Sequence, residues 1–540
     1  MLARSRPTSK ENETLMLNRT QTGYYFRKGY DPRDEQVELM EWWDSVRGNG
    51  VKCKKAAAPT GTGKSLGIDA ITKREEESGK KVSIVTGTII LQEQYRREFS
   101  EYPVLMGASN YDCVCFPGNT CDLTRQMDQL MGLKAGESCG DHCPYSRARS
   151  DCYEQSSAIF NTMSYHYFPK WSGGNDQVSK VPVTDLLIVD EFQMVAGMLN
   201  SMFELVIWED EIDIPFGTSA SVLATHALLK KRQSALSAYV KENITKLAPK
   251  KLKGLVGALN KIDEVARWLR DDSELFVIEE VNKLRYGKSL RCLQLRVIRP
   301  MPRVLNHFFA AKEVLLMSAT ALDIDVRELG FKKFDSIEVG SPIPVDQRLF
   351  YAENTVKYSF KTEAFATPLL VKRIKEICEN IHPNERGIIL TTYRFAEVLR
   401  QHLTDSRFVF HTQADKKAVV GEFVGGAGVN TVAILSGSWE GLDLKDDLAR
   451  FVIIPIFPLP NWKDSVVQKR VLLDQALETP EHWYEMQAMK SVIQGSGRAS
   501  RNERDKSTIY MLDSKFTGAF LKVKKQLPKA FIEAIRWSKR

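Results

Sequence analysis

The segment Ala58-Pro-Thr-Gly-Thr-Gly-Lys-Ser65 follows a short apolar run, Val51–Ala58, and precedes an amphipathic stretch. A glycine-rich turn between a predicted strand and a predicted helix is typical of a phosphate-binding loop, because backbone N–H groups and the helix N-terminus face the anion. We expect Lys64 to reach the β- and γ-phosphates and Ser65 to bind Mg²⁺. The first position of such loops is usually glycine, and in this chain it is Ala58. The other loop residues expected to contact a nucleotide are Thr60, Gly61, Thr62 and Gly63.

Short apolar runs alternate with amphipathic stretches on both sides of this loop, which predicts an α/β fold with parallel sheets. The chain of 540 residues is long enough for three or four domains. We therefore predict two parallel-sheet halves, with two insertions in the first. The expected strands are Val51–Ala58, Val82–Thr86, Leu186–Val189, Val314–Met317, Gly387–Thr391, Thr431–Leu435, Phe451–Ile456 and Thr508–Leu512.

Two stretches interrupt this alternation. Residues 107–152 hold six of the nine cysteines, with glycines, prolines and few aliphatic residues, so this segment needs a cross-link to fold. Residues 200–285 carry apolar side chains at helical spacing, as in Leu255, Leu259 and Ile262, and are predicted to form a helical subdomain.

Composition excludes several classes of protein. Hydrophobic residues make up 43% and charged residues 27%, and no apolar run approaches the ~18 residues of a membrane span. The polar N-terminus shows no secretion signal, so we expect a cytoplasmic (bacterial or virus-infected host) or nuclear protein that is not secreted and binds no membrane. In a reducing compartment, a dense cysteine patch indicates a metal or cluster site. The net charge of +8 fits a polyanionic partner and an ordinary basic enzyme equally well.

An acidic pair, Asp190-Glu191, ends one predicted strand at the edge where α/β sheets bind ligands. We expect Asp190 to hold Mg²⁺ through water and Glu191 to polarise the attacking water. Near the C-terminus, Arg498 and Arg501 lie three residues apart on a predicted helix and would suit a γ-phosphate clamp. Taken alone, these two arginines fit a surface ion-pair face better.

In their order along the chain, these motifs resemble those of the superfamily 2 helicases of the XPD/DinG type. The resemblance covers nearly the whole chain and implies two RecA-like motor domains that close on ATP. It also implies nucleotide contacts for Arg33, Gln36, Asp443 and Gln494, and a catalytic role for Arg498 and Arg501. The matching segments are Arg33 with Gln36, the phosphate loop, Leu91-Gln-Glu-Gln94, Asp190-Glu191, Ser318-Ala-Thr320, Trp439-Glu-Gly-Leu-Asp443 and Gln494-Gly-Ser-Gly-Arg498-Ala-Ser-Arg501.

The cysteine patch lies where this family inserts its [4Fe–4S] domain, and the helical stretch lies where it inserts an arch domain. The resemblance makes Cys113 the first ligand and Cys143 the last, and Cys139 is close enough in sequence to share the site. Cys121 is preferred as the fourth ligand over Cys115 and Cys152. A structural zinc is the rival metal, because four thiolates suit both groups.

The resemblance implies an ATP-dependent DNA helicase that moves 5′→3′ as a monomeric motor on single-stranded and forked DNA. ATP, Mg²⁺ and a [4Fe–4S] cluster are the implied cofactors. A translocase that displaces proteins without unwinding would share every motor motif, whereas an iron–sulfur redox protein would leave those motifs unexplained. Gln193 stands where the family usually has histidine, which bears on the coupling of hydrolysis to DNA.

The expected boundaries follow the motifs. Motor domain 1 comprises residues 1–106, 153–199 and 286–338, the cluster insert residues 107–152, the helical insert residues 200–285 and motor domain 2 residues 339–540.

Overall fold

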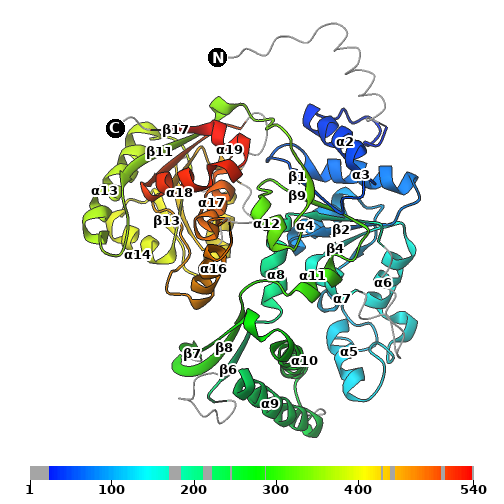
Figure 1. The fold of residues 1–540 in the computed structure, drawn as a ribbon. Coiled ribbons are helices and arrows are strands. Elements are labelled where there is room, and N and C mark those ends of the chain that lie inside the picture. Colours follow the sequence, from blue (N-terminus) through cyan, green and yellow to red (C-terminus); the bar gives the residue numbers. More distant parts are fainter. Residues whose placement is uncertain are drawn as a thin grey trace.

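A computed structural model gives the fold of the chain (Figure 1). None of the helices it describes is both long enough and apolar enough to cross a membrane. It describes residues 24–168, 184–210, 222–243, 246–285, 287–426, 428, 430–437, 444, 446–478, 480–499 and 505–537.

The first α/β half, the predicted motor domain 1, is built on a seven-stranded sheet in the order β10-β1-β9-β5-β2-β4-β3, with every pair parallel. Strands β2 and β5 are buried at every position, as expected for parallel strands covered on both faces. The strands are β1 Cys53–Ala57, β2 Val82–Thr86, β3 Val104–Leu105, β4 Ser157–Asn161, β5 Leu186–Asp190, β9 Glu313–Ser318 and β10 Phe334–Glu338. The helices are α2 Asp34–Val46, α3 Lys64–Glu77, α4 Ile89–Glu98, α7 Thr162–Tyr167, α8 Val195–Ser201, α11 Pro302–Phe308 and α12 Asp323–Glu328.

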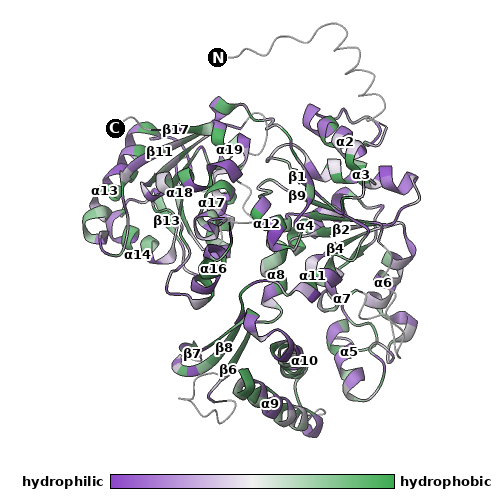
Figure 2. Ribbon diagram, in the orientation of Figure 1, coloured by the Kyte–Doolittle hydropathy of each residue, from purple (hydrophilic) through white to green (hydrophobic). Residues whose placement is uncertain are grey.

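The second motor domain repeats this plan with the order β13-β14-β12-β15-β16-β11-β17, again parallel throughout. Its strands are β11 Arg348–Val356, β12 Gly387–Thr391, β13 Phe408–Phe410, β14 Val432–Ser436, β15 Phe451–Ile454, β16 Ser507–Asp513 and β17 Ile535–Trp537. Its helices are α13 Glu363–Glu376, α14 Tyr393–His402, α15 Lys416–Val424, α16 Ser465–Gln475, α17 Trp483–Ser496, α18 Lys515–Val523 and α19 Lys529–Ala534. The strands of both sheets are largely hydrophobic, whereas the helices around them carry many hydrophilic residues (Figure 2). The prediction of two parallel-sheet α/β domains is confirmed.

The cysteine-rich segment forms a small lobe beside the first sheet, with α5 Cys121–Leu130 and α6 Pro144–Glu154 (Figure 1). Its remaining regular structure is two single turns of 3₁₀ helix, Ala108–Asn110 and Gly140–His142. Such short elements leave the buried cysteines to fill much of the interior of the lobe.

The second insert is not wholly helical. Helices α9 Val222–Asn243 and α10 Pro249–Asp271 pack together, and an antiparallel sheet of β6 Leu205–Trp208, β7 Phe276–Arg285 and β8 Lys288–Val297 lies beside them (Figure 1). The prediction of a purely helical subdomain is wrong for these strands, and the hairpin continues beyond residue 285. In β7, burial alternates between inner and outer positions, which is the period of a strand. Arg296 of β8 forms an ion pair with Asp464, 2.6 Å apart, which ties the insert to the second motor domain.

Candidate active site

The phosphate loop joins β1 to α3 at the carboxyl edge of the first sheet. Gly61 and Gly63 have φ angles of +91° and +74°, which disfavour residues with a Cβ. A Cβ at Gly63 would also collide with the side-chain amide of Gln36. The sequence Gly-Thr-Gly is therefore required both by the turn and by its neighbour. Thr62 is buried, and its hydroxyl donates to the carbonyl of Pro59 at 2.9 Å.

Arg33 and Gln36, which the resemblance predicts to contact the nucleotide, also contact this loop directly. The Arg33 guanidinium donates to the carbonyl of Gly61, and the Gln36 amide donates to the carbonyl of Gly63 at 3.1 Å. Gln36 in turn accepts from the backbone N–H of Arg33 at 2.9 Å and from the hydroxyl of Tyr30 at 3.0 Å. These hydrogen bonds link the start of α2 to the phosphate loop. They are made by the two side chains that are predicted to contact the nucleotide.

Lys64, the first residue of α3, forms an ion pair with Glu191, and its Nζ lies 3.9 Å from Asp190 Oδ1. Glu191 has a φ angle of +53°, a left-handed conformation that is rare for a residue with a side chain and is common at functional sites. The fold therefore brings the loop lysine into contact with the acidic pair.

Burial and a nearby cation set the charges of the acidic pair. Burial raises the pKa of Asp190 to about 6, with Lys64 opposing the shift and Glu191 adding to it. Burial also acts to raise the pKa of Glu191, but the charge of Lys64 and hydrogen bonds from Gln193, Lys64 and Ser318 outweigh it and lower this pKa to about 2. Two adjacent carboxylates in a buried site need such a cation to stay ionised.

Glu191 Oε2 accepts two further hydrogen bonds, one from Gln193 Nε2 at 2.7 Å and one from Ser318 Oγ at 3.1 Å. Ser318 reaches it because the strands align: Ala57 pairs with Ser318, and Asp190 pairs with Met317. The Ser-Ala-Thr and Asp-Glu motifs therefore meet at one carboxylate. Ser318 and Gln193 were not predicted as site residues, although both belong to motifs that the sequence analysis quoted.

We expect Ser318→Ala to lower kcat for ATP hydrolysis by about tenfold with little change in KM, because one charged hydrogen bond to the proposed base is lost. Steady-state kinetics would measure this effect. Ser83→Ala is the matched control, since Ser83 is also buried in this sheet but bonds Thr184 at 3.1 Å. An unchanged kcat in Ser318→Ala would show that this hydrogen bond does not serve hydrolysis.

The second motor domain meets the phosphate loop through the segment that ends α17. A Cβ added at Gly497 would lie 3.4 Å from Thr60 Oγ1, so this glycine permits close approach. Gln494 lines a cleft of about 370 Å³ between the domains, together with Gln193. Lys490 crosses the same boundary to Asp325 at 2.6 Å. The structure thus brings Gln494 next to the Asp-Glu motif from across the domain boundary.

Arg498 differs from the prediction of a helical position. Helix α17 ends at Ser496, so Arg498 lies in the following turn, where its backbone N–H donates to the carbonyl of Gly495 at 3.2 Å. Gly495 and Gly497 flank this end, and glycine favours helix termination. Arg501, Asp443 and Trp439 lie outside the described residues.

Comparison with known proteins finds helicases among the proteins that are similar in sequence. The family model of the helicase C-terminal domain matches residues 374–534. ATP-dependent DNA helicase CHL1 of Saccharomyces cerevisiae (strain YJM789) is 24% identical over 267 residues, which cover 42% of this chain and 30% of that protein. Regulator of telomere elongation helicase 1 of Homo sapiens is 32% identical over 115 residues, 19% of this chain and 9% of that protein.

Solved structures show the same fold. One described as "Structure of S. tokodaii Xpd4" has a TM-score of 0.56 at 14% identity, covering 94% of this chain and all of that one. Another, described as "XPD_Helicase", has a TM-score of 0.58 at 17% identity and covers 94% and 99% of the two chains. The chain resembles the superfamily 2 helicases of the XPD/DinG type. The resemblance predicted from its motifs is confirmed. The sequence matches nevertheless span less than half of each of these curated relatives, so its activity, substrates and partners are proposals.

The cysteine insert of this XPD/DinG-like chain brings four thiols together. Cys113 and Cys139 lie 3.4 Å apart, Cys121 and Cys143 lie 3.9 Å apart, and all four are buried. These are the four cysteines that the sequence analysis selected. Cys115 is exposed.

Within the described ranges, no three Cys, His, Asp or Glu side chains are arranged as a ready metal site. The donor set nevertheless fits a thiolate-bound group, because two close pairs of buried sulfur atoms lie in a lobe that lacks a large aliphatic core. Cys152 lies apart on α6, and burial raises the pKa of its thiol to about 12, as in an unreactive packing residue.

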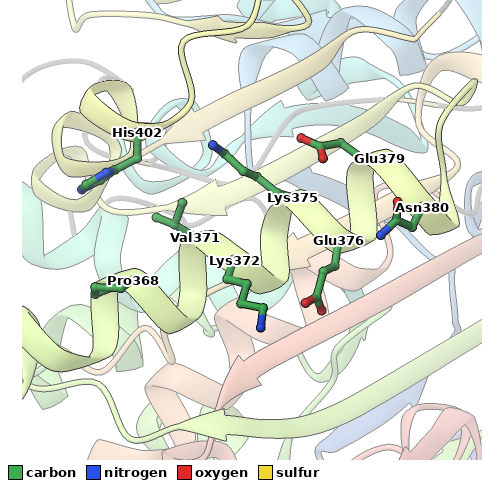
Figure 3. Close-up of a pocket in the computed structure, with 8 residues that line it drawn as sticks. All are labelled: Pro368, Val371, Lys372, Lys375, Glu376, Glu379, Asn380 and His402. Atoms are coloured by element: carbon green, nitrogen blue, oxygen red, sulfur yellow. The ribbon is translucent and has the colours of Figure 1, made fainter.

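A separate hollow of about 450 Å³ lies on the second motor domain, along α13 and its continuation (Figure 3). Lysine, glutamate and asparagine side chains line it, together with Pro368, Val371 and His402. None of the motif residues borders it. This hollow is therefore separate from the candidate active site.

Proposed function

We propose that the chain is an ATP-dependent DNA helicase. The observation that carries this proposal is the convergence on Glu191, where Lys64 of the phosphate loop, Ser318 and Gln193 all contact one carboxylate. The second motor domain borders the phosphate loop of this site, because Gly497 lies next to Thr60. A site built from both domains can change its contacts as the domains move, which is how a motor couples hydrolysis to movement.

The residues of the chain divide the work of hydrolysis. Loop N–H groups and Lys64 would bind the phosphates, and Glu191 would take the proton from the attacking water. Ser65 and Asp190 would hold Mg²⁺, which neutralises phosphate charge when bound. Arg498, and Arg501 with it, would stabilise charge on the γ-phosphate from the second domain. Arg33, Gln36, Asp443 and Gln494 would complete the nucleotide contacts.

Cys113, Cys121, Cys139 and Cys143 would hold a [4Fe–4S] cluster, whose chemistry here is that of a structural cross-link. The lobe exposes Phe116 and Tyr153, and aromatic rings of this kind can stack on single-stranded bases. The proposed partners are single-stranded and forked DNA, and the proposed direction is 5′→3′, with the chain acting as a monomer.

A forked duplex tests the proposal. Release of a strand from a 5′-tailed fork with ATP, and little release from a 3′-tailed one, would support a 5′→3′ helicase. DNA-stimulated ATPase activity without strand release would favour the alternative, a translocase that displaces bound proteins. Activity that follows redox potential and ignores ATP would contradict both.

Lys64→Ala should lower ATP hydrolysis by about 10²-fold or more, because the positioned ammonium at the transferring phosphoryl group is lost. Lys73→Ala is the control on the same helix, since Lys73 pairs with Asp69 at 2.7 Å away from the loop. Phosphate release with and without single-stranded DNA measures the effect. Hydrolysis at the parent rate in Lys64→Ala would overturn the site assignment.

A further inference from the structure

Tyr95, on α4, is a buried side chain that the proposed mechanism does not use. Its side chain is 1% exposed, and its hydroxyl donates to Asp190 Oδ2 at 3.1 Å. The side chain of Ser65 lies close enough to this hydroxyl to act on its pKa, which it lowers. The hydroxyl therefore bonds one of the groups that are expected to hold Mg²⁺, Asp190 of β5, and lies beside the other, Ser65 of the phosphate loop.

The contact leaves Asp190 with a fixed orientation. Its other oxygen, Oδ1, accepts from the backbone N–H of Glu191 at 3.0 Å, so both carboxylate oxygens have a donor. Each carboxylate oxygen can accept more than one hydrogen bond, and the carboxylate keeps acceptor capacity for a magnesium-bound water.

Helix α4 holds Tyr95 firmly. The side chain of Thr88 caps the helix by accepting from the N–H of Leu91 at 3.2 Å. Gln92 is buried and donates to the carbonyl of Leu105 at 2.8 Å, and it accepts from Asn161 at 3.0 Å. The ring of Tyr95 packs against Phe99 with 5.4 Å between centroids. The hydroxyl therefore has little freedom to leave Asp190.

We propose that Tyr95 is a positioning residue for magnesium, holding Asp190 beside Ser65 in the arrangement that binds a nucleotide with its metal ion. This inference rests on the proposed function, because it concerns the same nucleotide site. Groups that orient metal-binding side chains typically change metal affinity by about 10–100-fold when they are removed. A buried tyrosine also needs a partner for its hydroxyl, so the test must separate positioning from simple packing.

Tyr95→Phe removes only the hydroxyl and keeps the ring against Phe99. Tyr102→Phe is the matched control, because Tyr102 is also buried and donates to a buried carboxylate, Asp69, at 2.8 Å. A fluorescent ADP would be titrated onto each protein in excess EDTA and at increasing Mg²⁺ concentrations. Thermal unfolding of each variant would check that it is folded.

For Tyr95→Phe we expect ADP affinity in EDTA to stay within about twofold of the parent, while the Mg²⁺ concentration for half-maximal tightening rises about tenfold or more. Tyr102→Phe should leave that Mg²⁺ concentration unchanged. Equal Mg²⁺ dependence in Tyr95→Phe and the parent would overturn this inference alone. An equal rise in Tyr102→Phe would also overturn it, because the effect would then be one of packing. If the parent binds no nucleotide at all, both this inference and the proposed function fail.

Discussion

Glu191→Gln is expected to lower ATP hydrolysis by about 10³-fold while nucleotide binding survives, because an amide cannot accept the proton of the attacking water. The contacts of Glu191 explain why nucleotide binding should survive. Glu191 holds Lys64 through one oxygen and accepts from Gln193 and Ser318 through the other. Glutamine can keep the second set of contacts with its carbonyl oxygen. Its NH₂ group would then face the Lys64 ammonium, so the lysine is released toward the phosphates.

Nucleotide affinity in Glu191→Gln should therefore equal that of the parent or exceed it, and stay within about tenfold. Titration with a fluorescent nucleotide would measure the affinity, and phosphate release would measure the rate of ATP hydrolysis. Glu313→Gln is the control, because Glu313 forms the other buried lysine pair of this sheet, with Lys54 at 2.6 Å. That variant should lose stability and keep turnover. A loss of nucleotide binding in Glu191→Gln would make Glu191 a structural residue.

Strands that are buried on both faces and mostly apolar could be predicted from sequence almost residue for residue. Val82–Thr86 and Gly387–Thr391 match β2 and β12 because strands buried on both faces show continuous hydrophobic runs. Strand β4, Ser157–Asn161, was missed. It is buried at every position, yet serine and asparagine at its ends hide the apolar run.

The long strands of the second insert were missed for another reason. Half-buried and exposed positions alternate from Glu279 to Arg285, and this strand follows the long helical pattern of α10, which continues to Asp271. The change from helical to strand period occurs within a few residues. Such a change is hard to locate in one sequence, because short windows fit either period.

The sequence motifs predicted which segments form the candidate site, but they did not predict which side chains contact one another there. Lys64 and Glu191 come from motifs that imply one another. The contact between Ser318 and Glu191 instead depends on the strand order β1-β9-β5, which places the end of β9 between the loop and the acidic pair. The link from Tyr95 to Asp190 depends on how α4 packs, and a single tyrosine after Leu91-Gln-Glu-Gln94 carries no signal of its own in the sequence.

Cys143→Ser is the other variant with a large expected effect. Cys143 is buried, lies 3.9 Å from Cys121, and immediately precedes α6. If the four thiols hold a cluster, losing one ligand removes the cross-link of a lobe whose interior is built largely from cysteine and a few aromatic rings. Iron content and the brown absorbance should fall, and proteolysis should increase mainly within residues 107–152.

The candidate active site lies outside this lobe, so we expect different effects on strand separation and on ATP hydrolysis. Strand separation by Cys143→Ser should drop below about a tenth of the parent, while DNA-stimulated ATPase activity should stay within about threefold, because the lobe would split strands and take no part in hydrolysis. Cys152→Ser is the matched control, since Cys152 is a buried thiol of α6 apart from the four, and it should keep its iron. Full iron and full unwinding in Cys143→Ser would remove this residue from the ligand set. One zinc and no iron in the parent would assign the same four thiolates to a structural zinc, because such a site satisfies either metal and only the measured element distinguishes them.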